Sequence, residues 1–150
     1  MKKNKKLLPP MYLLIYLVAA AALHVTFPIT QIVHPPYTSI GIPLLLVGGS
    51  INLWVKNIFD RRQTTIIPFN KSSALITEGP FSFSRNPMYL GIVLLLLGVA
   101  FLLGSLAAFL APIAMFITLQ RKFIPYEEGM LEETFGKKYR VYKNRVRRWL

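Results

Sequence analysis

The sequence contains no cysteine among its 150 residues. This absence excludes disulfide bonds, zinc sites built from thiolates and catalysis by a cysteine nucleophile. The sequence also shows no Ser-His-Asp arrangement and no cluster of residues with the spacing of metal ligands. Fold and function must therefore be inferred from the distribution of apolar and charged residues and from the short polar motifs between them.

Charge is missing from two long stretches of the chain. No Asp, Glu, Lys or Arg occurs between Leu7 and Val55, and none occurs between Asn86 and Gln120. The second stretch has 35 residues. As one helix it would be about 50 Å long, whereas the hydrocarbon core of a bilayer is about 30 Å thick. We therefore expect a helical hairpin that turns at Gly104–Ser105 and returns the chain to the membrane face that it left.

The charged residues that are present fall into three groups. Of the 18 Lys and Arg, four lie in residues 1–6, five in residues 56–85 and nine from Arg121 onward. About four membrane spans put all three groups on one side of the membrane, and they cover residues 8–27, 39–58, 88–103 and 105–121. The positive-inside rule assigns that side and both termini to the cytoplasm. The sequence thus predicts an all-α, multi-pass integral membrane protein with a cytoplasmic tail, residues 122–150.

The overall composition agrees with a membrane protein. The chain is 53% hydrophobic, and its mean hydropathy is +0.44. The net charge of +12 is explained first by the positive-inside bias of membrane proteins and second by the binding of basic residues to anionic lipid headgroups. We therefore do not expect nucleic-acid binding. Without repeats or linkers, residues 1–150 are expected to form one domain. Gly48 and Gly49 allow a second helix to approach closely, either within the chain or between chains, and the oligomeric state is left open.

The tail becomes amphipathic after Tyr126. Apolar side chains recur there at spacings of three and four residues, which places them on one helical face: Leu131, Phe135, Tyr139, Tyr142 and Val146. One interpretation is a basic helix that lies on the inner leaflet. The other is a lid that bends at Gly136 and folds back over the cytoplasmic mouth of the hairpin.

Two polar segments flank the hairpin, and each has an ordinary structural explanation. Asn86 and Pro87 suit the N-cap and the first position of a helix. Glu127 and Glu128 suit the start of the last helix, where acidic residues complement the helix dipole. These explanations do not account for the order in which Arg-Asn-Pro-x-Tyr-x-Gly, the Glu pair and Phe-Gly-x-x-Tyr-x-x-Tyr occur around one hairpin.

The combined pattern resembles the integral-membrane methyltransferases that include isoprenylcysteine carboxyl methyltransferase and phospholipid N-methyltransferases. The similarity extends over residues 75–150. The matching elements are Leu75-Ile-Thr-Glu-Gly-Pro-Phe81, Arg85-Asn-Pro-Met-Tyr-Leu-Gly91, Glu127-Glu128, and Phe135-Gly136 with Tyr139 and Tyr142. This resemblance implies S-adenosylmethionine as the methyl donor, bound on the cytoplasmic side beneath the C-terminal segment. It also implies a lipid or other apolar methyl acceptor.

The resemblance further implies which residues form the cofactor site. Its lining would consist of Leu75, Ile76, Phe81, Asn86, Pro87 and Tyr89, with Gly91 completing the motif. Glu127 would contact the polar groups of the cofactor. On chemical grounds, Glu127 and Glu128 can bind its hydroxyl and amino groups, and Arg85 can pair with its carboxylate. The aromatic rings of Phe81 and Tyr89 can flank its adenine or its cation.

Two positions depart from the family's pattern. Asn86 stands where the family usually has His, and an amide cannot act as a general base near neutral pH. In the prenylcysteine enzymes an Arg about one turn before the acidic cofactor residue is expected to hold the substrate, whereas this chain has Phe123 there. The neighbouring cations Arg121 and Lys122 are then the candidates for substrate contact. No residue is assigned as a catalyst, and whether the acceptor group is a carboxylate, an amine or a thiol is left open.

Methyl transfer is compatible with so little acid–base machinery. A sulfonium donor is already activated, so the reaction depends on the alignment of the reactants more than on proton transfer. The soluble methyltransferase design is excluded, because the chain has no G-x-G-x-x-G loop and no βαβ pattern. Two other functions stay open beside methyl transfer: a non-catalytic membrane scaffold or lipid-binding protein, and an NADPH-dependent membrane reductase, since some sterol reductases have a similar C-terminal hairpin and tail.

Overall fold

A computed structural model describes residues 8–27, 30–63 and 74–150. Six α-helices follow one another in these ranges: α1 (Pro9–Thr26), α2 (Gly41–Arg61), α3 (Pro87–Leu103), α4 (Leu110–Thr118), α5 (Ile124–Phe135) and α6 (Lys137–Arg145). Four short segments link them, namely η1 (Tyr37–Ile40), η2 (Gly79–Ser82), η3 (Leu106–Phe109) and the π-helical η4 (Leu119–Phe123). The described part of the chain contains no β-strand, and the prediction of an all-α protein is confirmed.

The long apolar helices lie where the hydropathy pattern places them. Three helical segments are long and apolar enough to cross a membrane: Pro9–Thr26, Tyr37–Arg61 and Leu106–Phe135. The fourth apolar helix, Pro87–Leu103, has 17 residues and is shorter than these. The chain is therefore a membrane protein with three candidate spans. A fourth crossing stays a prediction, and so does the cytoplasmic placement of the termini, which depends partly on basic residues in 1–7 that lie outside the described ranges.

Helices α2 and α3 pack closely because glycines face each other across their contact. A Cβ atom added to Gly48 would lie 2.7 Å from the carbonyl oxygen of Gly91, and one added to Gly98 would lie 2.8 Å from the carbonyl oxygen of Gly41. Carbon and oxygen atoms cannot approach this closely, so only glycine fits. The predicted close approach of another helix is confirmed for Gly48, whereas a Cβ atom on Gly49 would meet open space.

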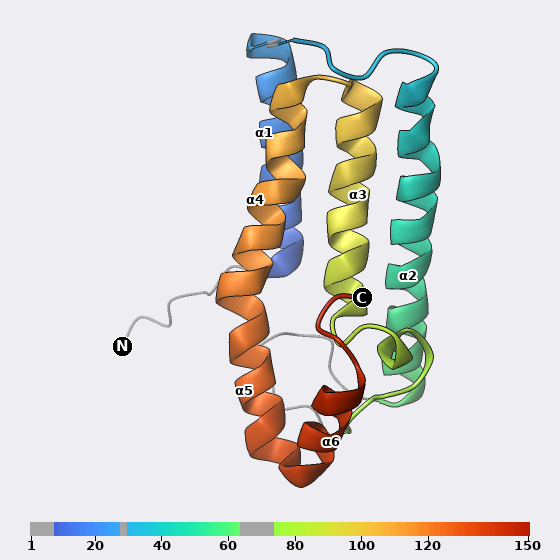
Figure 1. Ribbon diagram of the computed structural model, residues 1–150, viewed down its shortest axis with the longest axis vertical. Coiled ribbons are helices and arrows are strands. Elements are labelled where there is room, and N and C mark those ends of the chain that lie inside the picture. The colour runs from blue at the N-terminus through green and yellow to red at the C-terminus, as the bar shows by residue number, and fades with distance from the viewer. Residues whose placement is uncertain (1–7, 28–29, 64–73) are drawn as a thin grey trace.

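The hairpin turns at the predicted place. Helix α3 ends at Leu103, and Gly104 follows in the left-handed conformation with φ of 71°. Ser105 then leads into η3, and the chain returns through α4, η4 and α5 as one long helical arm. Figure 1 shows that α5 and α6 lie at the same end of the molecule as the start of α3. The two polar segments that flank the hairpin are therefore brought to one end, as predicted.

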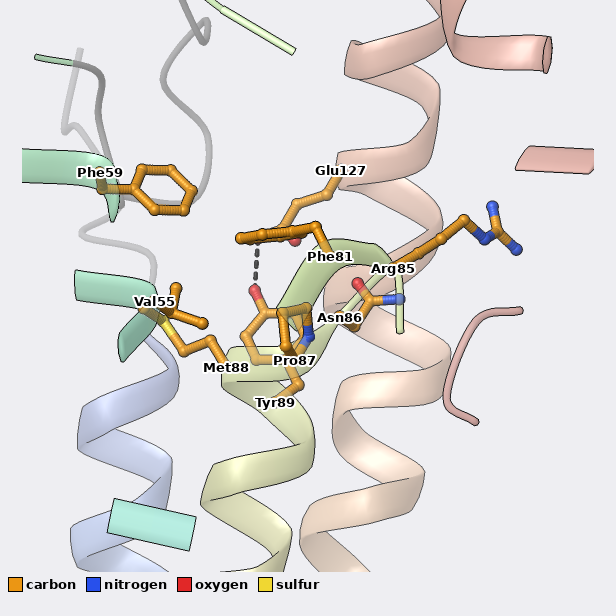
Figure 2. A pocket seen from close by; sticks show the side chains of 9 residues that line it. All are labelled: Val55, Phe59, Phe81, Arg85, Asn86, Pro87, Met88, Tyr89 and Glu127. Atoms are coloured by element: carbon orange, nitrogen blue, oxygen red, sulfur yellow. Dashed lines mark hydrogen bonds between the residues drawn. The ribbon is translucent and has the colours of Figure 1, made fainter. Parts of the chain in front are cut away.

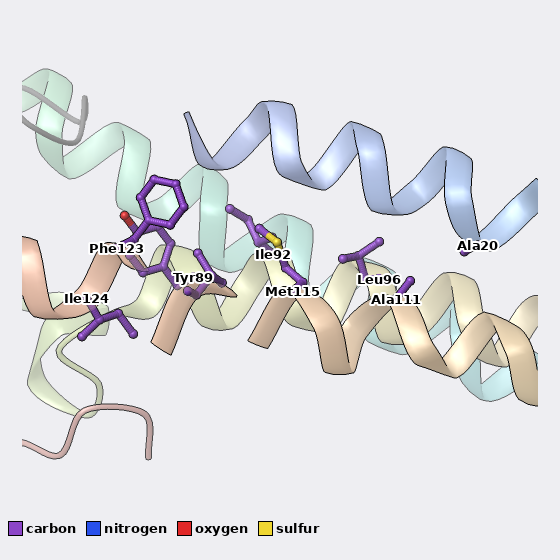
Figure 3. Packing of buried hydrophobic residues seen from close by; sticks show 9 residues of the cluster. Ala20, Tyr89, Ile92, Leu96, Ala111, Met115, Phe123 and Ile124 are labelled. Atoms are coloured by element: carbon purple, nitrogen blue, oxygen red, sulfur yellow. The ribbon is translucent and has the colours of Figure 1, made fainter. Parts of the chain in front are cut away.

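A hydrophobic cluster fixes the returning arm against α3 (Figure 3). Its buried members are Ala20, Tyr89, Ile92, Leu96, Ala111, Met115, Leu119, Phe123 and Ile124. The cluster reaches from the middle of the hairpin to the start of α5. Tyr89 belongs to this cluster. The apolar packing that holds the hairpin together therefore also positions the polar segment that begins with Arg85 and Asn86.

The tail folds back at Gly136, as one of the two interpretations expects, whereas its role as a lid over a cofactor site stays a prediction. Gly136 has φ of 50° and ψ of −120°, a conformation that L-residues rarely adopt, and it separates α5 from α6. Beyond this bend Tyr139 and Tyr142 are buried, and the Tyr142 hydroxyl donates a 2.7 Å hydrogen bond to the carbonyl oxygen of Phe81. The amphipathic face expected on one helix is thus divided between two, and α6 is tied to η2.

Candidate functional site

A cavity of about 80 Å³ lies between the end of α2, the start of α3 and the start of α5 (Figure 2). It is lined by Val55, Phe59, Phe81, Arg85, Asn86, Pro87, Met88, Tyr89 and Glu127. Five of these nine residues belong to the segment Arg85–Tyr89. Pro87 begins α3, and its ring fixes the backbone angle that the first helical turn requires. The segment Arg85–Tyr89 therefore lines the cavity at the point where the loop becomes helix α3.

The polar centre of this cavity is the contact between Tyr89 and Glu127. The Tyr89 hydroxyl donates a hydrogen bond to Oε1 of Glu127, which joins α3 to α5 across the cavity wall (Figure 2). Tyr89 is buried, and Glu127 is half-buried. A carboxylate has acceptor capacity for several hydrogen bonds, so Glu127 can still accept from a ligand while it is held by Tyr89.

Glu128 has a different environment from its neighbour. Its carboxylate pairs with Nη1 of Arg85 at 3.0 Å and receives two hydrogen bonds from Arg148, at 3.0 Å and 2.7 Å. The Glu128 side chain is only 10% exposed and does not line the cavity. The hydrogen bonds from Arg148 raise the pKa of that guanidinium further above its usual value. Glu128 thus acts as the buried counter-ion of two arginines.

Arg85 connects this ion cluster with the cavity. Its side chain is 9% exposed; Nη1 forms the ion pair with Glu128 and donates a hydrogen bond to the Tyr139 hydroxyl at 3.3 Å. Burial raises the pKa of Tyr139, which keeps this hydroxyl neutral. Among the described residues, Nε of Arg85 has no hydrogen-bond partner although it is buried. A buried donor without a partner is costly, and Figure 2 shows that this guanidinium is directed away from the other side chains that line the cavity.

The tail orients Asn86. The Asn86 side-chain amide donates from Nδ2 to the carbonyl oxygen of Arg148 at 3.0 Å, and the backbone amide of Arg85 donates to the carbonyl oxygen of Arg147 at 3.0 Å. Since only the NH₂ group can donate to a carbonyl, Oδ1 must face the other way, towards the cavity that Asn86 lines. Asn86 occupies the N-cap position of α3, but its side chain makes no capping hydrogen bond.

The remaining residues expected from the sequence lie elsewhere. Gly91 is buried at the contact with Gly48 and does not line the cavity. Leu75 and Ile76 do not line it either, although Ile76 is buried. Arg121 and Lys122 are exposed residues of η4. The Lys122 amine donates to the Tyr12 hydroxyl and lies 4.9 Å from the centroid of that ring.

Phe123 stands in the core where the prenylcysteine enzymes are expected to have an Arg. It is fully buried, and its ring centroid lies 6.4 Å from that of Tyr89. The π-helical turn therefore directs Phe123 inward while Arg121 and Lys122 stay on the surface. Bulged turns of this kind are frequent at functional sites because they change the direction of the side chains that follow them.

Sequence reasoning missed several residues of the site. Val55, Phe59 and Met88 line the cavity, and Arg148 holds Glu128. The spacing of four residues between Val55 and Phe59 is a signal that both share one face of α2. For Arg148 there was no local signal, because a basic residue in a basic tail is normally solvated. Within the described ranges, no three His, Asp or Glu side chains come together as metal ligands do.

Comparison with known proteins supplies one match. A family model described as phospholipid methyltransferase matches residues 37–138, more than half of the chain. No curated protein and no solved structure matches the chain. The matched region runs from η1 to the start of α6 and includes every residue that lines the cavity.

Proposed function

Because this chain belongs to the phospholipid methyltransferase family, we propose that it transfers a methyl group from S-adenosylmethionine to a lipid acceptor at the cytoplasmic face of a membrane. The family supports methyl transfer and a lipid acceptor. The choice of donor, the residues that hold it and the side of the membrane are the parts that this proposal adds.

The observation that carries the proposal is the carboxylate of Glu127, which lines the cavity and is held there by the Tyr89 hydroxyl. Arg85 lines the same cavity, but its guanidinium is directed away from the other lining side chains and pairs with Glu128 (Figure 2). The amino-acid end of S-adenosylmethionine has an ammonium group, which is the complement of the Glu127 carboxylate. When bound, the cofactor supplies a methyl group that its sulfonium has already activated.

The residues around the Glu127 carboxylate support the same assignment. Phe81 and Tyr89 present aromatic surface to the cavity, which suits a cationic sulfur or an adenine ring. Asn86 presents Oδ1, which can accept a hydrogen bond but cannot take a proton near neutral pH. The chain therefore binds and aligns the reactants, and any proton released by the acceptor leaves to solvent or to Glu127.

The size of the cavity sets a condition on binding. Its volume is about 80 Å³, whereas typical ligand sites have volumes of about 300–1,000 Å³. We therefore expect the walls to rearrange when the cofactor binds. Phe59 and Phe81 are the side chains placed to do so, because their ring centroids are 5.8 Å apart and together they form one wall.

The membrane placement follows from charge and hydropathy. We propose that α1, α2, α3 and the arm that begins with η3 all cross the membrane, which makes residues 1–150 one membrane-embedded domain. The described basic residues lie at the end of the helices that carries the cavity. By the positive-inside rule this end is cytoplasmic, where the cofactor is available.

Calorimetric titration tests the cofactor site. S-adenosylhomocysteine is titrated into detergent-purified protein and into the variants Glu127→Ala and Glu133→Ala. Glu133 is an exposed acid on the same helix, so its variant makes the same change of charge away from the cavity. We expect saturable binding that Glu127→Ala weakens about tenfold or more and Glu133→Ala leaves unchanged. A well-folded wild type that binds NADPH and not S-adenosylhomocysteine would contradict the proposal.

A second experiment tests the acceptor. The purified protein is incubated with S-adenosylmethionine labelled on its methyl group and with lipids of different headgroup. We expect label to appear in the lipid fraction only when the acceptor carries a nucleophilic group. If S-adenosylhomocysteine binds in the titration but no label reaches any lipid, the proposed cofactor site stands and the proposed lipid acceptor is rejected.

A further inference from the structure

A second cavity lies at the charged end of α2, outside the candidate methyl-transfer site. It has a volume of about 400 Å³, which is within the range of ligand sites. Its lining comes from two segments, and the residues are Trp54, Ile58, Arg61, Arg62, Glu78 and Gly79. None of them lines the first cavity. We call this second cavity the headgroup groove.

The headgroup groove and the first cavity are lined by adjacent faces of the same turns of α2. Trp54, Ile58 and Arg61 are spaced by four and three residues and share one face of α2, whereas Val55 and Phe59 share the next face. Gly79 closes the groove against α2. Gly79 lies beside Ile58 and has φ of 61°, a left-handed conformation that favours glycine.

The groove carries an excess of positive charge. Arg62 donates from Nε and Nη2 to the same oxygen of Glu78, at 2.9 Å and 2.6 Å. Both side chains are more than half exposed, so the pair is hydrated and open to a ligand. Two guanidinium groups beside one carboxylate leave a net charge of about +1. Guanidinium groups bind phosphate oxygens in a bidentate manner, which makes a phosphate group the natural complement.

The groove also adjoins apolar surface. Trp54 is 50% exposed, and Val47, two helical turns earlier on the same side of α2, is 51% exposed. This surface belongs to a candidate membrane span, so acyl chains cover it in the bilayer. Tryptophan is enriched where the hydrocarbon region meets the headgroups. The headgroup groove therefore lies where a lipid has its phosphate group.

We propose that the headgroup groove binds the phosphate of a membrane glycerophospholipid. The phosphodiester oxygens accept hydrogen bonds from the guanidinium groups of Arg61 and Arg62, and the acyl chains extend along α2 past Trp54. This inference goes beyond the proposed function, because the lipid bound here is recognised without the cofactor and need not be the molecule that is methylated.

Fluorescence of Trp54 tests this proposal directly. The chain has two tryptophans, so Trp149→Phe leaves Trp54 as the sole reporter. If that variant does not fold, the difference between wild type and Trp54→Phe isolates the same signal. The detergent-purified protein is titrated with phosphatidylcholine that is brominated on its acyl chains, and the quenching of Trp54 is recorded. Brominated diacylglycerol, which lacks the phosphate, is titrated in parallel.

Two double variants identify the residues that bind the phosphate. Arg61→Ala with Arg62→Ala removes both guanidinium groups from the groove. Lys137→Ala with Lys138→Ala removes the same charge from exposed positions on α6. We expect saturable quenching by phosphatidylcholine, and a half-saturation concentration about tenfold higher or more in the arginine double variant. The lysine double variant should match the reference protein.

Three results would overturn the proposal. Equal weakening in both double variants would show a general effect of surface charge. Equal saturation by diacylglycerol would show that only the apolar surface binds. Complete displacement of the lipid by inorganic phosphate at a similar concentration would identify the ligand as the free anion. Because the titration contains no cofactor, none of these results depends on methyl transfer.

Discussion

The hydroxyl of Tyr89 donates a hydrogen bond to the carboxylate of Glu127 and thereby joins α3 to α5 at the wall of the candidate cofactor cavity. The two residues are 38 positions apart and meet only because the hairpin returns the chain to the end from which it left. The proposed function gives this contact a specific purpose, which is to hold the Glu127 carboxylate in the orientation that a ligand requires.

Removal of the Tyr89 hydroxyl should therefore weaken ligand binding. In Tyr89→Phe the carboxylate of Glu127 is free to rotate and must be ordered by the ligand. Ordering one such side chain on binding costs about 0.5–1.5 kcal/mol, so we expect the dissociation constant for S-adenosylhomocysteine to rise about threefold to tenfold. Tyr16→Phe is the matched control. It also loses a hydroxyl hydrogen bond, the 2.8 Å contact with Thr118, but lies outside the cavity and should bind as wild type does.

Glu128 should affect stability and not ligand contact. Glu128→Ala leaves Arg85, which is 9% exposed, without its counter-ion. Breaking a buried pair in this way costs about 3–5 kcal/mol. Thermal unfolding in detergent should show a large loss of stability. Glu132→Ala is the control, because Glu132 pairs with Arg140 and Lys143 at the surface. Exposed pairs contribute about 0–1 kcal/mol, and equal effects of the two variants would refute the buried role of Glu128.

The bend at Gly136 should require glycine. Gly136→Ala forces a Cβ atom onto a residue with φ of 50°, and such strain costs about 1–3 kcal/mol. We expect α6 to detach more readily, which limited proteolysis between residues 135 and 145 would detect. Gly129→Ala provides the comparison, since Gly129 lies within α5 and its Cβ atom would meet open space. Rapid cleavage of both variants, or of neither, would contradict the prediction.

The contact of α2 with α3 should distinguish two neighbouring glycines. Gly48→Ala puts a methyl group 2.7 Å from the carbonyl oxygen of Gly91, whereas Gly49→Ala puts one into open space. Overpacking of this kind costs about 1–3 kcal/mol. Thermal unfolding in detergent should show a lower midpoint for Gly48→Ala. For Gly49→Ala the midpoint should be unchanged or slightly higher, because alanine is the better helix former.

Single-cysteine labelling tests the proposed topology. The chain has no cysteine, so each introduced thiol is the only target for a maleimide that cannot cross the membrane. Tyr37→Cys lies between α1 and α2 at a 65% exposed position, and Lys138→Cys lies on α6. We expect Tyr37→Cys to react in intact cells and Lys138→Cys to react only after the membrane is opened. Reaction of both from the same side would reject the four-span arrangement.

The helical architecture was predictable because hydropathy and charge act along the chain itself. The uncharged stretch of residues 86–120 is too long for one crossing, and this length alone indicates a hairpin. Gly104 in its middle marks the turn, where the structure shows φ of 71°. Pro87 marks the start of α3 in the same way. Each of these inferences depends on local geometry, so it did not require knowledge of the packing.

The polar contacts of the site were less predictable because they depend on side chains from distant segments. Glu127 and Glu128 are identical in type and adjacent in sequence, yet one lines the cavity and the other is the counter-ion of Arg85 and Arg148. That difference arises from the orientation of α5 after the π-helical turn and from the return of the tail. The motifs indicated which residues gather at this end of the molecule, but not which partner each would have.

The attachment of the tail to the start of α3 has a consequence for biosynthesis. Asn86 and Arg148, which are 62 positions apart, are joined by the amide hydrogen bond that orients Asn86. A ribosome therefore synthesises all the apolar helices before it reaches Arg148. A nascent chain interrupted before residue 147 has its helices but not an assembled site. Completion of the site is thus a late step, and only a chain translated through the tail acquires it.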